Sequence, residues 1–178
     1  METFECILSR RSVRNFLRRV VSDTEITKLL EAAIHAPSSG NLQNWLFIVV
    51  RDQTKKLQLA EAALGQMWIA TADVIIVVCS KTSRVMLRYG ERGSLYAIQN
   101  CAAAIQNILL AANNLGLGTC WVGAFEEDAV KRILKIPPDI DVHALIPVGY
   151  PAEKPPMPRR IPLEEVVFYN EFGKKSKD

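Results

Sequence analysis

Three arginines lie within five residues near the N-terminus, with a serine between them. The run reads Arg10, Arg11, Ser12, Val13 and Arg14. Planar guanidinium groups and a hydroxyl can bind one phosphate together through charge-assisted hydrogen bonds. A solvated basic face or a nucleic-acid patch would have the same composition. The cluster alone therefore does not distinguish an anion site from these alternatives. A second motif that suits the same ligand is needed to favour the anion site.

A polar loop between an apolar helix pattern and an apolar strand pattern is that second part. Its residues are Pro37, Ser38, Ser39, Gly40, Asn41, Leu42, Gln43 and Asn44. Short side-chain donors and acceptors suit a ligand rich in hydrogen-bonding groups, whereas the same residue types also make ordinary turns. A turn explains Pro37 and Gly40. It explains less well why Gln43 and Trp45 stand where the strand begins.

These two motifs, in this order, resemble the flavin-dependent nitroreductase family. The resemblance rests on Arg-Arg-Ser-x-Arg followed by Pro-Ser-Ser-x-Asn-x-Gln-x-Trp, and it continues through residues 121–123 and 158–166. It covers nearly the whole chain, and the order and spacing of the motifs carry it. One departure is Asn44, where the family commonly has proline. We expect this change to relax the loop without abolishing ligand binding.

The resemblance implies a site for FMN. The residues at the family's positions for phosphate, ribityl and ring-edge contacts are Arg10, Arg11, Ser12 and Arg14. The residues of the loop, which the family takes from the opposite subunit, are Pro37, Ser38, Ser39, Asn41 and Gln43. The terminal basic motif adds Arg159 and Arg160, of which Arg160 is favoured for the phosphate. Arg18 and Arg19 lie outside the motif and are expected to be solvated.

Val122 and Gly123 match the family's segment that faces flavin N5. A glycine lets a backbone N–H group approach a ligand closely, and a donor there would favour the electron-rich, reduced flavin. The alternative is that Gly123 only turns the chain at a strand end. Trp45 is expected in the core, since large aromatic side chains dominate buried area.

The activity that the resemblance implies consists of two half-reactions at FMN. NADH or NADPH delivers hydride to N5 and leaves, and a nitroaromatic, a quinone or another flat electrophile then enters the same pocket. No Ser-His-Asp set, nucleophilic cysteine or carboxylate pair stands out, so no catalytic side chain is predicted. Two alternatives stay open: a flavin-binding regulatory or storage module, and a flavin-fragmenting or dehalogenating relative on the same fold.

Composition limits the remaining function classes. The chain has 178 residues, 49% hydrophobic and 23% charged, which suits one globular domain over 1–178. A net charge of +3 is too small to indicate nucleic acid. Four widely spaced cysteines suit a reducing cytoplasm, and no targeting or membrane-spanning segment is expected. The lone histidines His35 and His143 predict no metal site.

Hydrophobic periodicity predicts the elements that position these motifs. Helices are expected over residues 3–10, 26–36, 54–64, 94–115 and 126–135. Strands are expected over residues 45–50, 72–80, 119–123 and 142–150. The second helix begins with a capping box, Ser22 with Glu25, and the strand over 72–80 is apolar enough to lie centrally, covered on both faces. Residues 81–93 show no period and are expected to form a loop or lid.

Strands that alternate with helices predict an α+β domain, an α/β three-layer arrangement. The helix over 94–115 is apolar around most of its circumference, which favours burial at a subunit interface. From residue 151 onward prolines keep the chain extended, and the apolar tail over 166–169 has little of its own subunit to pack against. The resemblance implies a mixed central sheet flanked by helices in a swapped homodimer, with residues 151–178 as an arm that embraces the partner.

Overall fold

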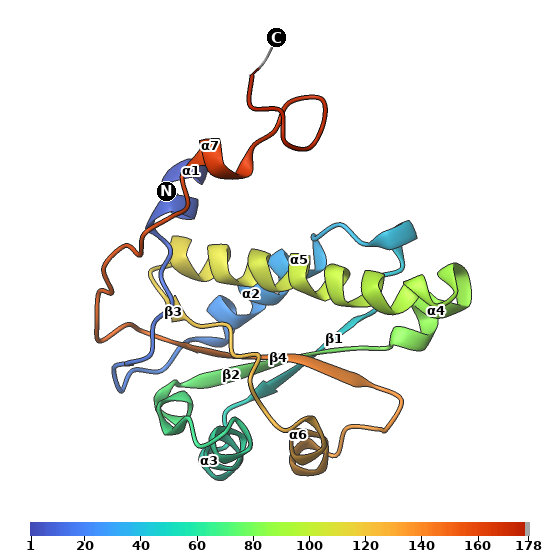
Figure 1. The fold of residues 1–178 in the computed structure, drawn as a ribbon. Helices are drawn as coiled ribbons and strands as arrows, with labels where there is room; N and C mark the ends of the chain where they lie inside the picture. Colours follow the sequence, from blue (N-terminus) through green and yellow to red (C-terminus); the bar gives the residue numbers. More distant parts are fainter. Residues whose placement is uncertain (177–178) are drawn as a thin grey trace.

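Four strands form one sheet at the centre of the molecule, and the computed structural model describes residues 1–176 (Figure 1). The strands are β1 (Trp45–Val50), β2 (Val74–Ser80), β3 (Gly118–Thr119) and β4 (Asp141–Gly149), in the order β1-β2-β4-β3. One face carries α2 (Asp23–Ile34) and α5 (Arg92–Asn114), and the other carries α3 (Gln53–Ala62) and α6 (Glu127–Leu134). The predicted α+β class with three layers is confirmed.

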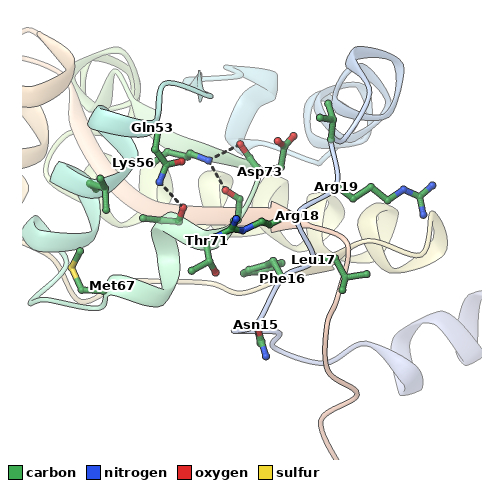
Figure 2. A pocket seen from close by; sticks show the side chains of 14 residues that line it. Asn15, Phe16, Leu17, Arg18, Arg19, Gln53, Lys56, Met67, Thr71 and Asp73 are labelled. Atoms are coloured by element: carbon green, nitrogen blue, oxygen red, sulfur yellow. Dashed lines mark hydrogen bonds between the residues drawn. The ribbon is translucent and has the colours of Figure 1, made fainter.

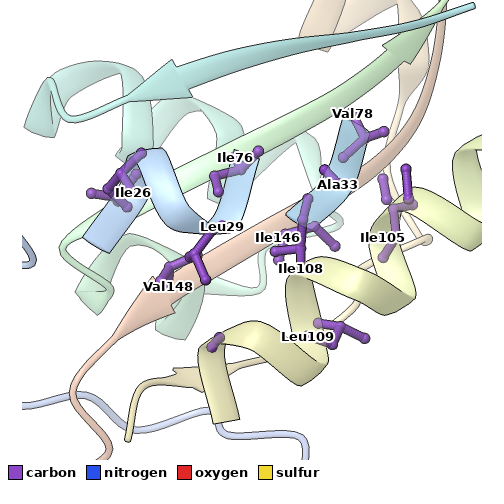
Figure 3. Close-up of a cluster of buried hydrophobic side chains, with 14 of the residues drawn as sticks. Ile26, Leu29, Ala33, Ile76, Val78, Ile105, Ile108, Leu109, Ile146 and Val148 are labelled. Atoms are coloured by element: carbon purple, nitrogen blue, oxygen red, sulfur yellow. The ribbon is translucent and has the colours of Figure 1, made fainter. Parts of the chain in front are cut away.

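Successive residues of β2 face two separate cores. Val74, Ile76 and Val78 pack with α2 and α5, as Figure 3 shows for this core. Ile75 and Val77 pack with the helices of the opposite layer. Because neighbouring side chains point to opposite faces of a strand, a strand covered on both sides must be apolar throughout. All of β2 is buried, which confirms its predicted central place.

The long helix α5 is the main cover of the first face. Ile105, Ile108 and Leu109 lie buried in the core beside the sheet (Figure 3). Among residues 1–176 it is the one helix long and apolar enough to cross a membrane, and its packing against α2 and β2 accounts for that composition. Its outer face stays exposed at Leu95 (42%) and Ile98 (52%). Within one chain, α5 is therefore not buried around nearly its whole circumference, as its composition led us to expect.

The prediction of a loop or lid over residues 81–93 is wrong. The segment forms α4 (Thr82–Tyr89) and the first turn of α5. Val85 is fully buried, whereas Met86 and Leu87 directly after it are exposed, so the apolar residues of α4 are consecutive and do not show a helical period. A Cβ on Gly93 would lie 2.6 Å from the Met86 Cα atom, so the glycine allows α4 and α5 to cross closely.

Two further expectations about strands need correction. The strand expected over 119–123 is shorter, because β3 ends at Thr119 and Val122 forms only an isolated bridge with Leu145. All pairings between the named strands are antiparallel. The expected mixed sheet would contain parallel strands as well. Within residues 1–176 the parallel pairing consists of one isolated bridge, between Ser12 and Thr119.

The C-terminal arm leaves the end of β4 and runs past α1 (Thr3–Ser9) (Figure 1). It starts beside the N-terminal segment, where Pro151 bridges Phe16 and the Ala152 N–H donates to the Asn15 carbonyl at 2.9 Å. A short helix, α7 (Leu163–Val166), interrupts the arm. Several large apolar side chains of the arm are exposed, including Ile161 and Leu163. The arm therefore has apolar surface that its own chain does not cover.

A half-buried histidine ties two central strands together. His143 of β4 and the hydroxyl of Ser80 at the end of β2 form a hydrogen bond of 2.7 Å, and this hydroxyl also lies 3.0 Å from the Thr82 hydroxyl at the start of α4. Burial lowers the pKa of His143 below its ordinary value of 6.5, against the opposing effect of Asp141 and Glu127. The folded protein therefore holds this ring neutral where an unfolded chain would protonate it.

This difference predicts a pH dependence of stability. Between the lowered pKa of folded His143 and 6.5, the unfolded state binds more protons, so the free energy of unfolding should fall as the pH falls through that window. His143→Gln should reduce the slope by up to about 1.4 kcal/mol per pH unit. Urea unfolding at several pH values and fixed protein concentration measures it. Equal slopes in the variant and the wild type would contradict the assignment.

Candidate functional site

A hollow of about 410 Å³ brings the N-terminal arginine cluster together with the C-terminal arm. Its lining residues are Arg10, Arg11, Ser12, Arg14, Pro155, Pro156, Pro158 and Arg160. No carboxylate is among them, and Arg159 is absent while Arg160 is present. The hollow is therefore basic, and of the two arm arginines Arg160 is the one that joins the cluster.

The N-terminal cluster is positioned by the end of α1. Asn113, in the last turn of α5, donates to the Cys6 carbonyl at 3.0 Å and to the Ser9 hydroxyl at 2.9 Å, which fixes α1 against α5. The chain then runs beside β3, where the Val13 N–H donates to the Thr119 carbonyl at 2.9 Å. A Cβ on Gly118 would come within 2.9 Å of Val13, so this close approach requires glycine.

The segment after β3 lies beside the same cluster. Burial raises the pKa of the Cys120 thiol, while Arg14 and Ser12 nearby act to lower it. Two residues on, Val122 exchanges backbone hydrogen bonds of 3.0 Å with Leu145. The cluster at 10–14 therefore lies beside Thr119 and Cys120, the residues that lead into the motif at 122–123.

Gly123 is exposed, and its backbone is not in the left-handed region. Its N–H has no acceptor within residues 1–176. A Cβ there would meet only the Trp121 Nε1 atom at 3.9 Å, in otherwise open space. A turn does not require glycine under these conditions, so the free N–H and the open space are the features that distinguish this position.

Two neighbours of this region carry no motif and were not expected from the sequence. The Trp68 ring, in the short helix η2 (Met67–Thr71), lies with its centroid 5.8 Å from the Arg14 guanidinium. The Gln66 side-chain amide donates to the Ala124 carbonyl at 3.3 Å, next to Gly123. A glutamine and a tryptophan in a connecting segment give no periodic signal, so only the fold identifies them.

The polar loop over 37–44 is held by internal hydrogen bonds. The Gln43 N–H donates to the Ser38 hydroxyl at 3.1 Å. The Ser39 N–H donates to Asn100 Oδ1 at 2.9 Å, and Asn100 Nδ2 donates back to the Ser39 hydroxyl at 3.0 Å. Asn100 is buried in α5 and was also not expected from the sequence. Of the loop's predicted side chains, the Asn41 amide forms no hydrogen bond within residues 1–176.

The loop backbone is strained where the short helix η1 (Ser39–Asn41) forms. Gly40, Asn41 and Gln43 have φ of 54°, 54° and 47°. Glycine adopts this left-handed region freely and asparagine tolerates it, but glutamine does so at a cost. Such strain collects at ligand-binding segments, where the surrounding structure holds it in place.

Asn44, which replaces the family's proline, does not relax the loop as expected. Its side chain is only 2% exposed, and its Oδ1 accepts a hydrogen bond of 2.6 Å from Asn100. Its Nδ2 has no partner within residues 1–176. The substitution therefore adds a tie between the loop and α5 that proline could not make. Trp45 beside it lies in the core, as predicted.

One chain does not bring the polar loop to the arginine cluster. Asn100 binds the loop and Asn113 binds the segment before the cluster, and both belong to α5. Thirteen residues separate them, which is about 20 Å along an α-helix. The predicted residues therefore fall into two groups, one tied to α5 near its middle and the other near its C-terminal end.

Arg18 and Arg19 line a different and larger hollow, of about 720 Å³, shown in Figure 2. None of the motif residues lines it. Its buried Lys56 donates to the carbonyls of Ala72 at 2.7 Å and Asp73 at 3.1 Å, which ties α3 to the start of β2. Arg18 is exposed as expected. Arg19 is not simply solvated, because its guanidinium lies 3.6 Å from the centroid of the Tyr150 ring.

No group of three or more histidine, cysteine or carboxylate side chains that could hold a metal ion occurs within residues 1–176. The four cysteines are free and buried. Burial raises the pKa of both Cys79 and Cys101 to about 12, which makes them unreactive thiols. The chemistry that this chain supports is therefore binding and orienting rather than nucleophilic attack.

Known proteins share both the sequence pattern and this fold. The profile of the nitroreductase family matches residues 7–73 and 66–150. A protein of Archaeoglobus fulgidus, provisionally named an NADH dehydrogenase/NAD(P)H nitroreductase, is 39% identical over 158 residues, which cover 86% of this chain and 87% of that protein. The NADH dehydrogenase of Thermus thermophilus is 33% identical over 190 residues, with 91% and 93% covered.

Solved structures agree. A crystal structure of a protein from Parabacteroides distasonis with the same provisional name has a TM-score of 0.84 at 32% identity and covers 96% of this chain and 98% of that chain. The NADPH:FMN oxidoreductase of Vibrio harveyi, solved with NAD+, has a TM-score of 0.87 at 27% identity and covers 97% and 78%. Fold and sequence thus define a nitroreductase-type α+β protein. The chain belongs to the nitroreductase family.

The hollow predicts different roles for the two adjacent arm arginines. Arg160→Ala should weaken FMN binding by about tenfold or more, because a charge-assisted hydrogen bond contributes about 1.5–3 kcal/mol. Arg159→Ala is the matched control and should change the affinity less than about twofold. Fluorescence titration of the apoprotein with FMN measures both. Equal losses in the two variants would contradict the assignment of Arg160.

Proposed function

We propose that this chain is an FMN-dependent oxidoreductase that transfers hydride from NADH or NADPH to a nitroaromatic, a quinone or another flat electrophile. As a member of the nitroreductase family it is an NAD(P)H-dependent oxidoreductase with FMN as cofactor. Relatives named FMN reductase in Bacillus subtilis and NADPH-flavin oxidoreductase in Vibrio harveyi support this class. The observation that carries the proposal is the basic hollow that joins Arg10–Arg14 to Arg160.

The residues present fit FMN. The hollow provides guanidinium groups and the Ser12 hydroxyl, which suit a phosphate, and the neighbouring Glu153 carboxylate accepts from the Arg14 backbone N–H at 2.6 Å. The Gly123 N–H, which has no acceptor within residues 1–176, follows the segment at Cys120 that lies beside the cluster, and it would donate to the edge of the flavin ring. When bound, FMN supplies the atom that accepts and releases hydride. The protein's part is to hold the phosphate, orient the ring and position a donor at its edge.

We propose that the complete site forms between two copies of the chain. The arginine cluster and the polar loop lie about 20 Å apart along α5, so one FMN would meet both only if they came from different subunits. Leu95 and Ile98 of α5 and the apolar side chains of the arm are exposed, and a partner would cover them. A two-fold dimer with antiparallel α5 helices would place one chain's loop beside the other chain's arginines.

Two other functions would give different results in experiments on the purified protein. A storage or regulatory module would bind FMN but would not accept hydride from a pyridine nucleotide. A flavin-fragmenting or dehalogenating enzyme would consume the flavin or release halide. The names of the relatives favour reduction, and reduced, buried cysteines fit the cytoplasm as the proposed location.

Subunit mixing tests the shared site. The double variant Arg10→Ala with Arg14→Ala should lose FMN at its own cluster, and Asn41→Ala with Gln43→Ala should lose the loop's contribution. Dissociating and reassociating the two variants together should restore about one quarter of the wild-type sites, because half of the dimers are mixed and each carries one intact site. Recovery of no activity, from variants that each fold, would place loop and cluster in one subunit's site.

Anaerobic rapid mixing with NADH and NADPH tests the activity and the role of Gly123. The wild type should bleach in the visible flavin band, whereas a storage module would not. Gly123→Val should slow flavin reduction on the order of 10²-fold, since its side chain would fill the space beside the free N–H. FMN affinity should change less.

The control for that experiment is Ala124→Val, which adds similar bulk at the next exposed residue. It should reduce at nearly the wild-type rate. Wild-type rates in a fully flavinated Gly123→Val variant would show that the glycine has no part in the reaction.

A further inference from the structure

The α4 helix and its flanks are strongly basic. Between residues 81 and 92 the basic residues are Lys81, Arg84, Arg88 and Arg92, against one acid, Glu91. Lys81 lies 3.9 Å from Asp139, and Arg92 donates to the Tyr96 hydroxyl at 2.8 Å. Arg84 and Arg88 are exposed, and neither forms an ion pair or hydrogen bond within residues 1–176. These two arginines are therefore available to an external anion.

Their spacing works against the helix that carries them. Residues four apart lie on the same face of a helix, and two like charges at this spacing destabilise it. α4 has only eight residues and no side-chain cap at its N-terminus, and Arg88 in its last turn interacts favourably with the helix dipole while Arg84 does not share that position. An anion bound between the two guanidinium groups would remove the repulsion.

The pair stands beside the polar loop of the proposed flavin site. A Cβ built on Gly40 would lie 3.3 Å from the Arg88 guanidinium carbon and 2.6 Å from the Tyr89 hydroxyl. The C-terminal end of α4 therefore covers the strained turn of the loop. Arg84, one turn earlier, lies farther along the same exposed face.

We propose that Arg84 and Arg88 bind the 2′-phosphate of NADPH and give this enzyme a preference for NADPH over NADH. The inference rests on the proposed function, in which the loop contacts the flavin. The two coenzymes differ only in this phosphate, at the end of the molecule remote from the hydride. Arg88 lies beside the loop at Gly40, so a coenzyme whose nicotinamide is bound over the flavin and whose adenosine end is directed toward α4 would bring this phosphate to the two guanidinium groups. Two guanidinium groups on adjacent turns suit one doubly charged phosphate.

The experiment compares the ratio of kcat/KM for NADPH to that for NADH in matched variants. Arg84→Ala and Arg88→Ala should each lower this ratio about tenfold, because each loses a charge-assisted contact that only NADPH makes. Arg132→Ala is the control, since Arg132 is also exposed but lies on α6, on the opposite face of the sheet. Calorimetric titration with NADP+ and NAD+ gives the same comparison without turnover.

Each outcome decides the assignment. An unchanged ratio in both α4 variants overturns it, and so does an equal loss for both coenzymes, which would place the contact on their shared pyrophosphate. Arg88 lies beside Gly40 and Arg84 does not. A change of the ratio in Arg84→Ala is therefore caused by the lost charge and not by a disturbed loop. Dissociation of the dimer in the variants would assign the arginines to acids of the partner copy and overturn the proposal. A wild type that oxidises neither coenzyme would instead refute the proposed function.

Discussion

The packing of α5 on the central sheet is the constraint on which the rest of the structure depends. Ile105 and Ile108 fix the helix over β2 and β4, so its position is set by the largest core. Asn100 near the middle of the helix and Asn113 near its C-terminal end then hold two surface segments, the polar loop and the end of α1. Because a helix is rigid along its axis, the loop and the arginine cluster keep a fixed separation. This fixed separation is the physical basis for the proposal that the site forms between two chains.

The sequence predicts well whatever depends on local patterns. The capping box at Ser22 and Glu25 forms with both of its hydrogen bonds, and the doubly buried strand β2 lies at the centre as its composition requires. The order of the motifs was enough to identify the family and to favour Arg160, which the fold places with the cluster. The capping box and β2 depend on residues that are close in sequence. The family was identified from the spacing of its motifs, which can also be read from the sequence.

What the sequence does not reveal depends on contacts between distant segments. The apolar residues of α4 are consecutive and show no helical period, and its close approach to α5 depends on Gly93, which is distant from any motif. Asn100 looks like an isolated polar residue in an apolar helix until the fold places it beside Ser39 and Asn44, 61 and 56 residues away. Trp68 reaches Arg14 only through the turn of η2. None of these pairs has a signature that a single sequence can show.

The bonds inside the polar loop determine what it can still offer a ligand. The Ser38 hydroxyl accepts from the Gln43 N–H and the Ser39 hydroxyl accepts from Asn100 Nδ2, so both hydroxyls shape the loop. The Asn41 side-chain amide forms no hydrogen bond within residues 1–176 and can bind an external partner. A loop already ordered in one chain loses little conformational entropy on binding. The hydrogen bond from Asn100 to Asn44 also orders the loop, because it fixes the loop to the rigid α5 helix. A proline at position 44 would restrict the backbone instead. The loop is thus prepared before a flavin or a second subunit arrives.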